Sequence, residues 1–207
     1  MKLLLIIFIA VNVYASSYPY FSSKEIDIIK NTSGNKAKNR VEDYIKTINY
    51  YKYLSKKEQL AKVNSYLNQL LSKTDSNNNK TTDYWETPKE FLKIGYGDCE
   101  DYAIIKYYTL LKLGFKKSRL YMTIVYDKFS KSYHMVLSYF ETRGKPPLIL
   151  DNLSFRILTL DKRDDLIVHK LINEDGTYTL DKNYCLLRVD ETHPKLKSLL
   201  KKVKKDN

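Results

Sequence analysis

The chain has 207 residues, of which 43% are hydrophobic and 29% are charged, and it carries a formal net charge of +12. This size and composition suit one domain with a hydrophobic core and exclude disordered, collagen-like and coiled-coil proteins. The positive charge comes mostly from lysine, whereas proteins that read nucleic acids rely on the planar fork of arginine. We therefore interpret the surplus charge as a solvated surface.

The first fifteen residues have the pattern of a cleavable export signal. Lys2 supplies a positive charge, an apolar run extends from Leu3 to Val13, and the small residues at 13 and 15 predict cleavage after Ala15. The run is short for a membrane span, so we expect removal of residues 1–15 and a periplasmic protein that is not embedded in the membrane. An uncleaved N-terminal anchor is the alternative. Export also argues against a nucleic-acid partner.

After the signal, the chain first predicts helices. Residues 16–39 are polar and weakly patterned, so we expect a flexible N-terminal segment there. From residue 40 apolar side chains recur at helical spacing, and Ser55 with Glu58 forms the capping-box pattern that starts a second helix. We expect these two helices to pair as a hairpin over residues 40–72. The polar residues 72–83 predict a loop.

Two helix starts follow this loop. Residues 87–90, Thr-Pro-Lys-Glu, combine an N-cap, a proline at the first helical position and a capping-box glutamate, and they predict a short helix that ends at Gly95. Asp98 is a favourable N-cap for a longer helix from Cys99 to Leu113. The cysteine therefore stands at the first position of a helix.

The second half of the chain predicts strands. Apolar and aromatic stretches between turn residues indicate strands at Leu120–Tyr126, Tyr133–Phe140, Pro147–Asp151, Leu166–Leu171, Tyr178–Leu180 and Tyr184–Val189. Helices followed by antiparallel strands predict an α+β fold, with one domain over residues 40–194. The lysine-rich residues 195–207 form a tail, either a helix or a frayed end, to which we assign no role.

Three residues in these elements suit nucleophilic catalysis. A thiol at the first turn of a helix lies where backbone N–H groups and the helix dipole favour the thiolate. His134 lies in one predicted strand and Asp151 ends the next, so the sheet can bring both beside Cys99 as general base and orienting carboxylate. Spacing alone leaves open a structural cysteine and a structural histidine.

Two cysteines in an exported protein also suggest a disulfide. Cys99 and Cys185 are the two candidates, and a bond between them would remove the nucleophile. Cys185 falls in a predicted strand, which favours a buried and inert thiol. We interpret His169 and His193 as solvated or structural residues.

Several sequence blocks form a specific combination: Tyr84–Leu92, Gly97–Ile104 with Lys106-Tyr107, His134–Leu137 and Leu150–Leu153, together with Lys62–Asn68 and Arg163–Leu166. In order and spacing they resemble the bacterial transglutaminase-like cysteine proteinases, in particular the LapG-type periplasmic proteases that cleave surface adhesins. The likeness spans about residues 40–182. It implies a papain-like, transglutaminase-type α+β core with Cys99, His134 and Asp151 as the catalytic triad.

Three acids surround the expected nucleophile. Asp98, Glu100 and Asp101 place negative charge beside Cys99, which disfavours a thiolate. These carboxylates either point into backbone caps and solvent or bind a hard cation, and oxygen ligands crowded at a turn suit Ca²⁺. The resemblance implies calcium bound by these three residues.

The resemblance also implies a function. It indicates an exported cysteine endopeptidase that forms a thioester acyl-enzyme and cleaves the N-terminal region of a large surface adhesin, in the control of biofilm adhesion. It implies capture by an inner-membrane receptor of the LapD type that responds to cyclic-di-GMP. Trp85, the single tryptophan, is a candidate contact for that receptor, although core packing is its default role.

Two other functions stay open from the sequence. An acyl-enzyme on the same fold can be resolved by an amine instead of water, which gives transglutaminase or deamidase-type acyl transfer. The second alternative is a catalytically silent periplasmic protein that binds acidic partners through its basic surface.

Overall fold

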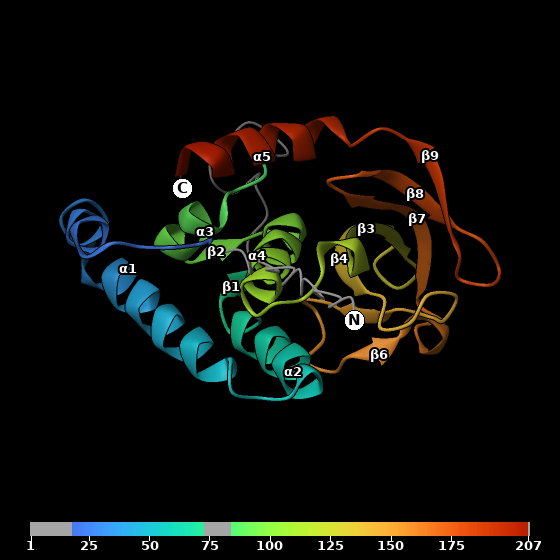
Figure 1. The fold of residues 1–207 in the computed structure, drawn as a ribbon, viewed down its shortest axis with the longest axis horizontal. Helices are drawn as coiled ribbons and strands as arrows, with labels where there is room; N and C mark the ends of the chain where they lie inside the picture. Colours follow the sequence, from blue (N-terminus) through green and yellow to red (C-terminus); the bar gives the residue numbers. More distant parts are fainter. Residues whose placement is uncertain (1–17, 73–83, 207) are drawn as a thin grey trace, which may run out of the picture.

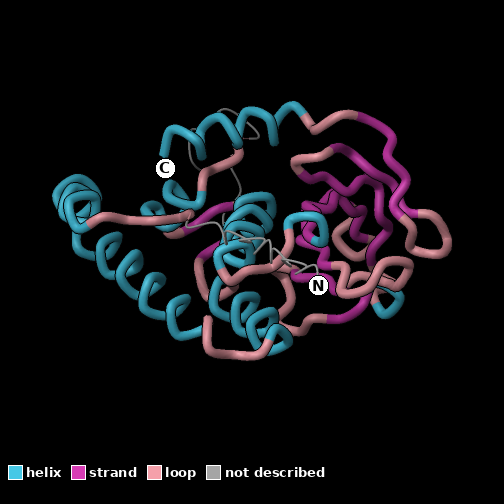
Figure 2. Tube along the Cα trace, in the orientation of Figure 1, coloured by secondary structure: helices cyan, strands magenta, loops and turns pink. Residues whose placement is uncertain are grey.

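The helices come first in the chain and the main sheet follows. The computed structural model describes residues 18–72 and 84–206. Its helices are α1 (Ser23–Tyr51), α2 (Lys56–Leu67), α3 (Pro88–Ile94), α4 (Cys99–Lys112) and, after the sheet, α5 (Pro194–Asp206). Figures 1 and 2 show α4 between the other early helices and the sheet. The predicted α+β class is confirmed.

The main sheet is antiparallel and has the strand order β6-β5-β4-β3-β7-β8-β9. Its strands are β3 (Leu120–Asp127), β4 (Ser132–Tyr139), β5 (Leu148–Leu150), β6 (Leu158–Thr159), β7 (Leu166–Asn173), β8 (Gly176–Leu180) and β9 (Leu186–Asp190). A separate parallel pair joins β1 (Leu71–Ser72) to β2 (Tyr96–Gly97). We did not predict β1, β2 or β6, because a two-residue strand is too short to show alternation.

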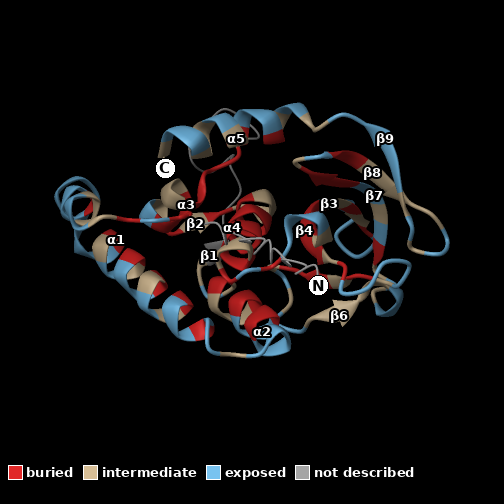
Figure 3. Ribbon diagram, viewed as in Figure 1, coloured by how far each residue is buried: buried red, intermediate tan, exposed pale blue. Residues whose placement is uncertain are grey.

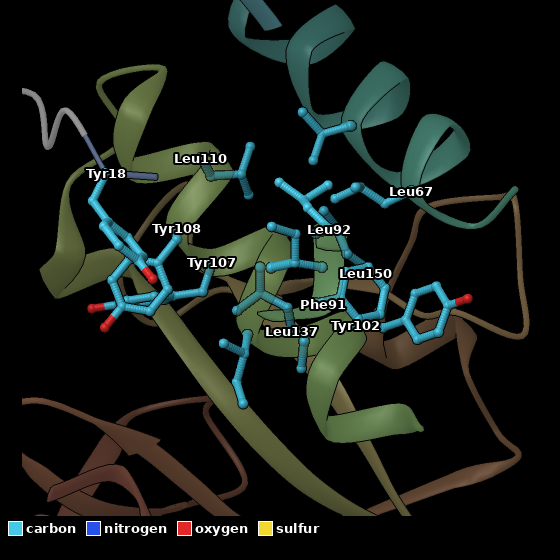
Figure 4. Packing of buried hydrophobic residues seen from close by; sticks show 14 of the residues in the cluster. Tyr18, Leu67, Phe91, Leu92, Tyr102, Tyr107, Tyr108, Leu110, Leu137 and Leu150 are labelled. Atoms are coloured by element: carbon cyan, nitrogen blue, oxygen red, sulfur yellow. The ribbon is translucent and has the colours of Figure 1, made fainter. Parts of the chain in front are cut away.

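Helix α4 is the centre of the core. Every residue from Asp101 to Leu110 is buried, since α4 packs on β3 and β4 on one side and on α2 and α3 on the other. Figure 3 shows this burial, and Figure 4 shows Leu67, Leu92 and Leu150 converging on one apolar cluster. Each fully buried side chain of this size contributes about 1.5–3 kcal/mol relative to exposure. A helix held on all sides gives its first residue, Cys99, a fixed position.

The predicted flexible segment at residues 16–39 is wrong over most of its length. Helix α1 begins at Ser23 and continues past a kink at Gly34, where φ is 83°. Ser22 and Glu25 form a full capping box, and Ile29 and Ala37 are buried against the core. The polar composition of this stretch hid both the cap and the narrow apolar face.

The expected hairpin of two helices is only partly seen. The Ser55–Glu58 capping box starts α2 as predicted, but α1 packs mainly on α3 and α2 mainly on α4. Arg40 of α1 explains part of this arrangement, because its Nε donates to Leu92 O at 2.6 Å and its terminal nitrogen to Lys93 O at 2.8 Å. These bonds satisfy carbonyls at the end of α3 that have no partner within the helix.

The lysine-rich residues 195–207 do not form a separate tail. Helix α5 places Leu196 and Leu199 in the main core cluster, where they are 1% and 0% exposed. Figure 3 shows the opposite face of α5 exposed, which leaves most of its lysines in solvent. We predicted a domain over residues 40–194. Its core therefore also includes α5 and the start of α1.

Two predicted segments lie outside the described residues: the export signal at 1–15 and residues 73–83 of the polar loop. Within residues 18–72 and 84–206, no helix has both the length and the apolar character needed to cross a bilayer.

Candidate active site

An open cleft of about 400 Å³ lies where the start of α4 meets β4. Its walls include Cys99 and Glu100 from α4, His134 and Met135 from β4, and Trp85, Ile124, Tyr133, His193 and Lys195. Cys99 and His134 are therefore brought to the same cleft, as predicted from the chain order of helix and strand.

Cys99 is half-buried at the first position of α4, directly after its N-cap Asp98. Its thiol donates a hydrogen bond to Glu100 Oε2 at 3.2 Å. Burial raises the pKa of Cys99, the carboxylates of Glu100 and Asp98 raise it further, and the backbone amide of Met135 lowers it. The helix start alone predicted a lowered pKa, but burial and the neighbouring acids dominate, so this arrangement holds the thiol protonated.

His134 is joined to Asp151 behind the cleft. Nε2 of His134 lies 2.8 Å from Asp151 Oδ1, and the two side chains are only 9% and 1% exposed. A carboxylate only accepts hydrogen bonds, so Nε2 carries a proton in this bond, which does not use Nδ1. Burial raises the pKa of Asp151, but the bonds from His134, the Leu153 amide and Arg163 outweigh it and lower the pKa well below its ordinary range.

Arg163 is a member of this group that our sequence analysis did not single out. Its terminal nitrogen donates to Asp151 Oδ2 at 2.8 Å and to Asp165 Oδ2 at 2.6 Å, and its Nε donates to Asp165 Oδ1 at 2.9 Å. Asp165 thus fixes the guanidinium that holds Asp151. Arg163 falls within a sequence block that carries the family resemblance, but its spacing indicates no partner.

The three acids beside Cys99 are joined by a fourth, Glu86. Asp101 is 1% exposed, and its two carboxylate oxygens accept from the backbone amides of Glu86 at 2.8 Å and Asp98 at 3.3 Å. Burial raises the pKa of Asp101 to about 9, and the charges of Glu86, Asp98 and Glu100 contribute to this rise. Gly97 is required here, because a Cβ would lie 2.6 Å from Asp101 Oδ2.

This acidic cluster has the donor chemistry of a calcium site, since all its side-chain ligands are oxygens. The negative carboxylates raise one another's pKa by repulsion. A cation at this position is favoured because it offsets that repulsion. Among residues 18–72 and 84–206, however, no three side chains converge as a ready coordination sphere. The two carboxylate oxygens of Asp101 accept hydrogen bonds from the backbone amides of Glu86 and Asp98 instead.

Trp85 has the burial of a core residue. It is 5% exposed and stacks on His193 with ring centroids 5.8 Å apart and an interplanar angle of 11°. Its carbonyl oxygen accepts a bond from Lys202 of α5. Trp85 therefore does not present the open aromatic face that we expected of a partner contact, and the core-packing interpretation fits. His193, which we did not assign to the site, lines the cleft beside it.

The two cysteines do not pair. Cys99 and Cys185 are both free thiols, so the disulfide alternative is wrong. Cys185 is exposed rather than buried, because it lies in a turn where its amide donates to Asp181 Oδ1 at 2.8 Å, and β9 begins only after it.

A cysteine that begins a buried helix and shares a cleft with a histidine bonded to a buried aspartate is the arrangement of a papain-like, transglutaminase-type cysteine protease. The chain matches the family "Bacterial transglutaminase-like cysteine proteinase" over residues 35–175, and it belongs to that family. It is a cysteine protease. A comparison with curated protein sequences found no match.

Solved structures of LapG from Legionella pneumophila are similar to this chain. The calcium-bound form is 33% identical, with a TM-score of 0.71, and the match covers 86% of this chain and 98% of LapG. The EGTA-treated form is 32% identical, with a TM-score of 0.73, and the match covers 86% of this chain and 97% of LapG. These matches show that most of the chain has the fold of a solved LapG, in agreement with the family assignment.

Proposed function

We propose that this cysteine protease is an exported endopeptidase in which Cys99 is the nucleophile, His134 the general base and Asp151 the carboxylate that orients His134. The observation that carries the proposal is the 2.8 Å bond between His134 and Asp151, directly behind a cleft that also contains Cys99. Three features support this assignment: Cys99 begins a helix, His134 lies on a strand, and the buried Asp151 is bonded to His134.

The chemistry follows from these positions. His134 Nδ1 takes the proton of Cys99, and the thiolate attacks a peptide carbonyl to form a tetrahedral oxyanion. The backbone N–H of Cys99 is one donor to this oxyanion, because the first amides of a helix have no intrahelical acceptor. Collapse releases the amine with the proton from His134 and leaves a thioester. Water, deprotonated by His134, then hydrolyses the thioester and restores the thiol.

Glu100 sets a condition on the first step. Its carboxylate accepts the thiol hydrogen at 3.2 Å, so this bond must break before His134 can take the proton. A cation bound here would supply positive charge that would hold these carboxylates and stabilise the thiolate. We assign this cation as Ca²⁺ and its side-chain ligands as Asp98, Glu100 and Asp101.

Two observations support calcium. The acids form an oxygen-only cluster whose mutual repulsion a divalent cation relieves, with Glu86 as a fourth carboxylate beside it. The similar LapG of Legionella pneumophila has been solved both calcium-bound and EGTA-treated. Without metal, these carboxylates hold the thiol protonated. Calcium would offset their charge, and we therefore expect activity to depend on calcium.

The proposed substrate is the N-terminal retention region of a large surface adhesin, cut at a site of small residues such as paired alanines. The family membership and the export pattern of residues 1–15 support a periplasmic protease of this kind. The proposed regulator is an inner-membrane receptor of the LapD type, which responds to cyclic-di-GMP and thereby links cleavage to biofilm adhesion.

Incubation of the mature protein with the N-terminal segment of a large adhesin from the same cell tests this function. We expect two fragments in calcium, none in EGTA, recovery when calcium is restored, and no cleavage by Cys99→Ala. Mass spectrometry separates hydrolysis from acyl transfer, because transfer or deamidation changes the mass without shortening the chain. Cleavage by the Cys99→Ala variant would refute the mechanism.

A further inference from the structure

The loop that carries Asp151 is held from behind by two asparagines, Asn64 of α2 and Asn68, the residue that caps the end of this helix. Asn68 Nδ2 donates to Asp151 O at 2.8 Å and to Ser154 O at 3.0 Å. Asn64 Nδ2 donates to the same Ser154 carbonyl at 2.8 Å. Asn64 and Asn68 are four residues apart on a helix and therefore lie on one face. The two side-chain amides thus donate hydrogen bonds to the first and last carbonyl oxygens of the 151–154 turn.

A buried lysine orients the side-chain amide of Asn64. Lys106 of α4 is 0% exposed, and its Nζ donates to Asn64 Oδ1 at 2.8 Å. An ammonium can only donate and the Ser154 carbonyl can only accept, so together they fix the amide of Asn64 with Oδ1 toward Lys106 and Nδ2 toward Ser154 O. The ring of Tyr102 lies 5.9 Å from Nζ and covers another side of it.

The burial of Lys106 is itself unusual. Lysine is almost never fully buried, because removal of its amine from water is unfavourable. A methionine would fill similar space in this apolar part of α4 at lower cost in free energy, so packing alone does not account for a lysine. What the lysine adds is the bond to Asn64 and, as an ammonium, a positive charge that interacts with Asp151.

The same helix also carries the nucleophile. Cys99 and Lys106 are seven residues apart on α4, which is about two turns and places them on one side of the helix. α4 therefore positions Cys99 directly, and it positions Asp151 through Lys106, Asn64 and the 151–154 turn.

We propose that Lys106, Asn64 and Asn68 are positioning residues that keep the Asp151 carboxylate within hydrogen-bond distance of His134. This inference rests on the triad assigned under the proposed function. The turn needs such support because it leads only to the two-residue strand β6, and a shift of about 1 Å in an active-site group can lower the rate by up to about 100-fold.

A matched pair of substitutions tests the inference. Lys106→Met removes the donor to Asn64, whereas Lys106→Gln keeps an N–H donor on a side chain that is one atom shorter. The probe is iodoacetamide, with calcium present, and peptide mapping reports the labelling rate of Cys99 separately from that of the exposed Cys185. We expect Lys106→Met to slow labelling of Cys99 by about 10-fold, within the range for a misplaced group. We expect Lys106→Gln to stay near wild type and Cys185 to be unchanged in both.

A spectroscopic readout separates positioning from stability. In protein labelled with ¹⁵N-histidine, the His134–Asp151 bond fixes the Nε2–H tautomer, and Lys106→Met should yield a mixture of tautomers while Lys106→Gln keeps one. Asn68→Ala provides the same readout from α2 if Lys106→Met does not fold. An unchanged tautomer and labelling rate in a folded Lys106→Met or Asn68→Ala protein would overturn the inference.

The proposed function fails in a different way. Asp151→Asn should slow Cys99 labelling at least as strongly as Lys106→Met. If Asp151→Asn labels Cys99 at the wild-type rate, the triad assignment is wrong. If Asp151→Asn slows labelling and the Lys106 and Asn68 variants do not, the triad stands and the positioning role is refuted.

Discussion

Arg163 donates to the Oδ2 atom of Asp151 at 2.8 Å, on the carboxylate oxygen that His134 does not use. One oxygen thus accepts from His134 and the other from the guanidinium of Arg163, so the carboxylate cannot rotate without breaking one of two short bonds. Asp165 anchors the same guanidinium. Asp151 is therefore held at its side chain by Arg163 and at its backbone by Asn68.

Arg163→Met should lower the stability of the protein near neutral pH by about 1.5–3 kcal/mol, the usual contribution of a hydrogen bond to a charged group. Burial raises the pKa of Asp151, but its hydrogen bonds lower it below the ordinary value of 3.8. A lowered carboxyl pKa stabilises the fold above about pH 4 and loses this contribution as the pH falls below it. The difference between wild type and Arg163→Met, measured by urea denaturation, should therefore shrink in acid.

Arg163→Lys is the matched control. It keeps the charge but loses the fork that binds Asp151 and Asp165 together, so we expect an intermediate loss of stability. A difference between wild type and Arg163→Met that stays constant down to pH values below about 4 would contradict the role of the Asp151 charge.

Lys106→Met should change the pH dependence of stability in the alkaline range. Burial lowers the pKa of Lys106 to about 7 from its ordinary 10.5. Below pH 7 both the folded and the unfolded state bind the proton, and the full cost of burying a charge applies. Between about pH 7 and 10.5 the folded state binds fewer protons, so the free energy of unfolding rises with pH.

The Met variant lacks this rise. Relative to wild type, it should be more stable at about pH 6 than at about pH 9 by about 3 kcal/mol, because the two pH units between 7 and 9 each correspond to about 1.4 kcal/mol. Urea denaturation of both proteins at the two pH values measures the difference, in which other titrating groups cancel. Parallel pH profiles would show that Lys106 keeps its charge when buried.

The local signals in the sequence predicted local structure well. The capping boxes at Ser55 and Thr87 mark the starts of α2 and α3, and Asp98 marks the start of α4, because each signal lies within four residues of the group it satisfies. The same signal at Ser22 was masked by the polar residues after it. The buried face of α5 was hidden in the same way among lysines.

The candidate site was predicted to a smaller extent. Cys99, His134 and Asp151 followed from their elements and from a family resemblance. The groups that hold them did not, because their contacts join distant parts of the chain: Lys106 to Asn64 across 42 positions, and Asn64 to Ser154 across 90. Such pairs have no periodic or local signature, so only the folded chain reveals them.

Glu100→Gln should release the thiol of Cys99 in the absence of metal. The substitution removes the negative charge that accepts the thiol hydrogen at 3.2 Å and that raises the thiol pKa, second to burial. In EGTA we expect Cys99 of this variant to react with iodoacetamide faster than wild type, roughly 3-fold for each unit by which its pKa falls, because the larger thiolate fraction outweighs its lower nucleophilicity. Calcium should then have less effect on labelling, with Cys185 as the internal control. Equal rates for wild type and variant in EGTA would show that Glu100 does not restrain the thiol.

Leu199→Ala should destabilise the protein although it lies in the lysine-rich C-terminal segment. Leu199 is 0% exposed and belongs to the main core cluster, so its truncation leaves a cavity that costs about 2–5 kcal/mol. Lys201→Ala, on the exposed face of the same helix, should stay within about 0.5 kcal/mol of wild type. Urea denaturation followed by circular dichroism measures both variants. If the two substitutions have equal, small effects, α5 does not contribute to the core in solution, and the lysine-rich segment is a tail after all.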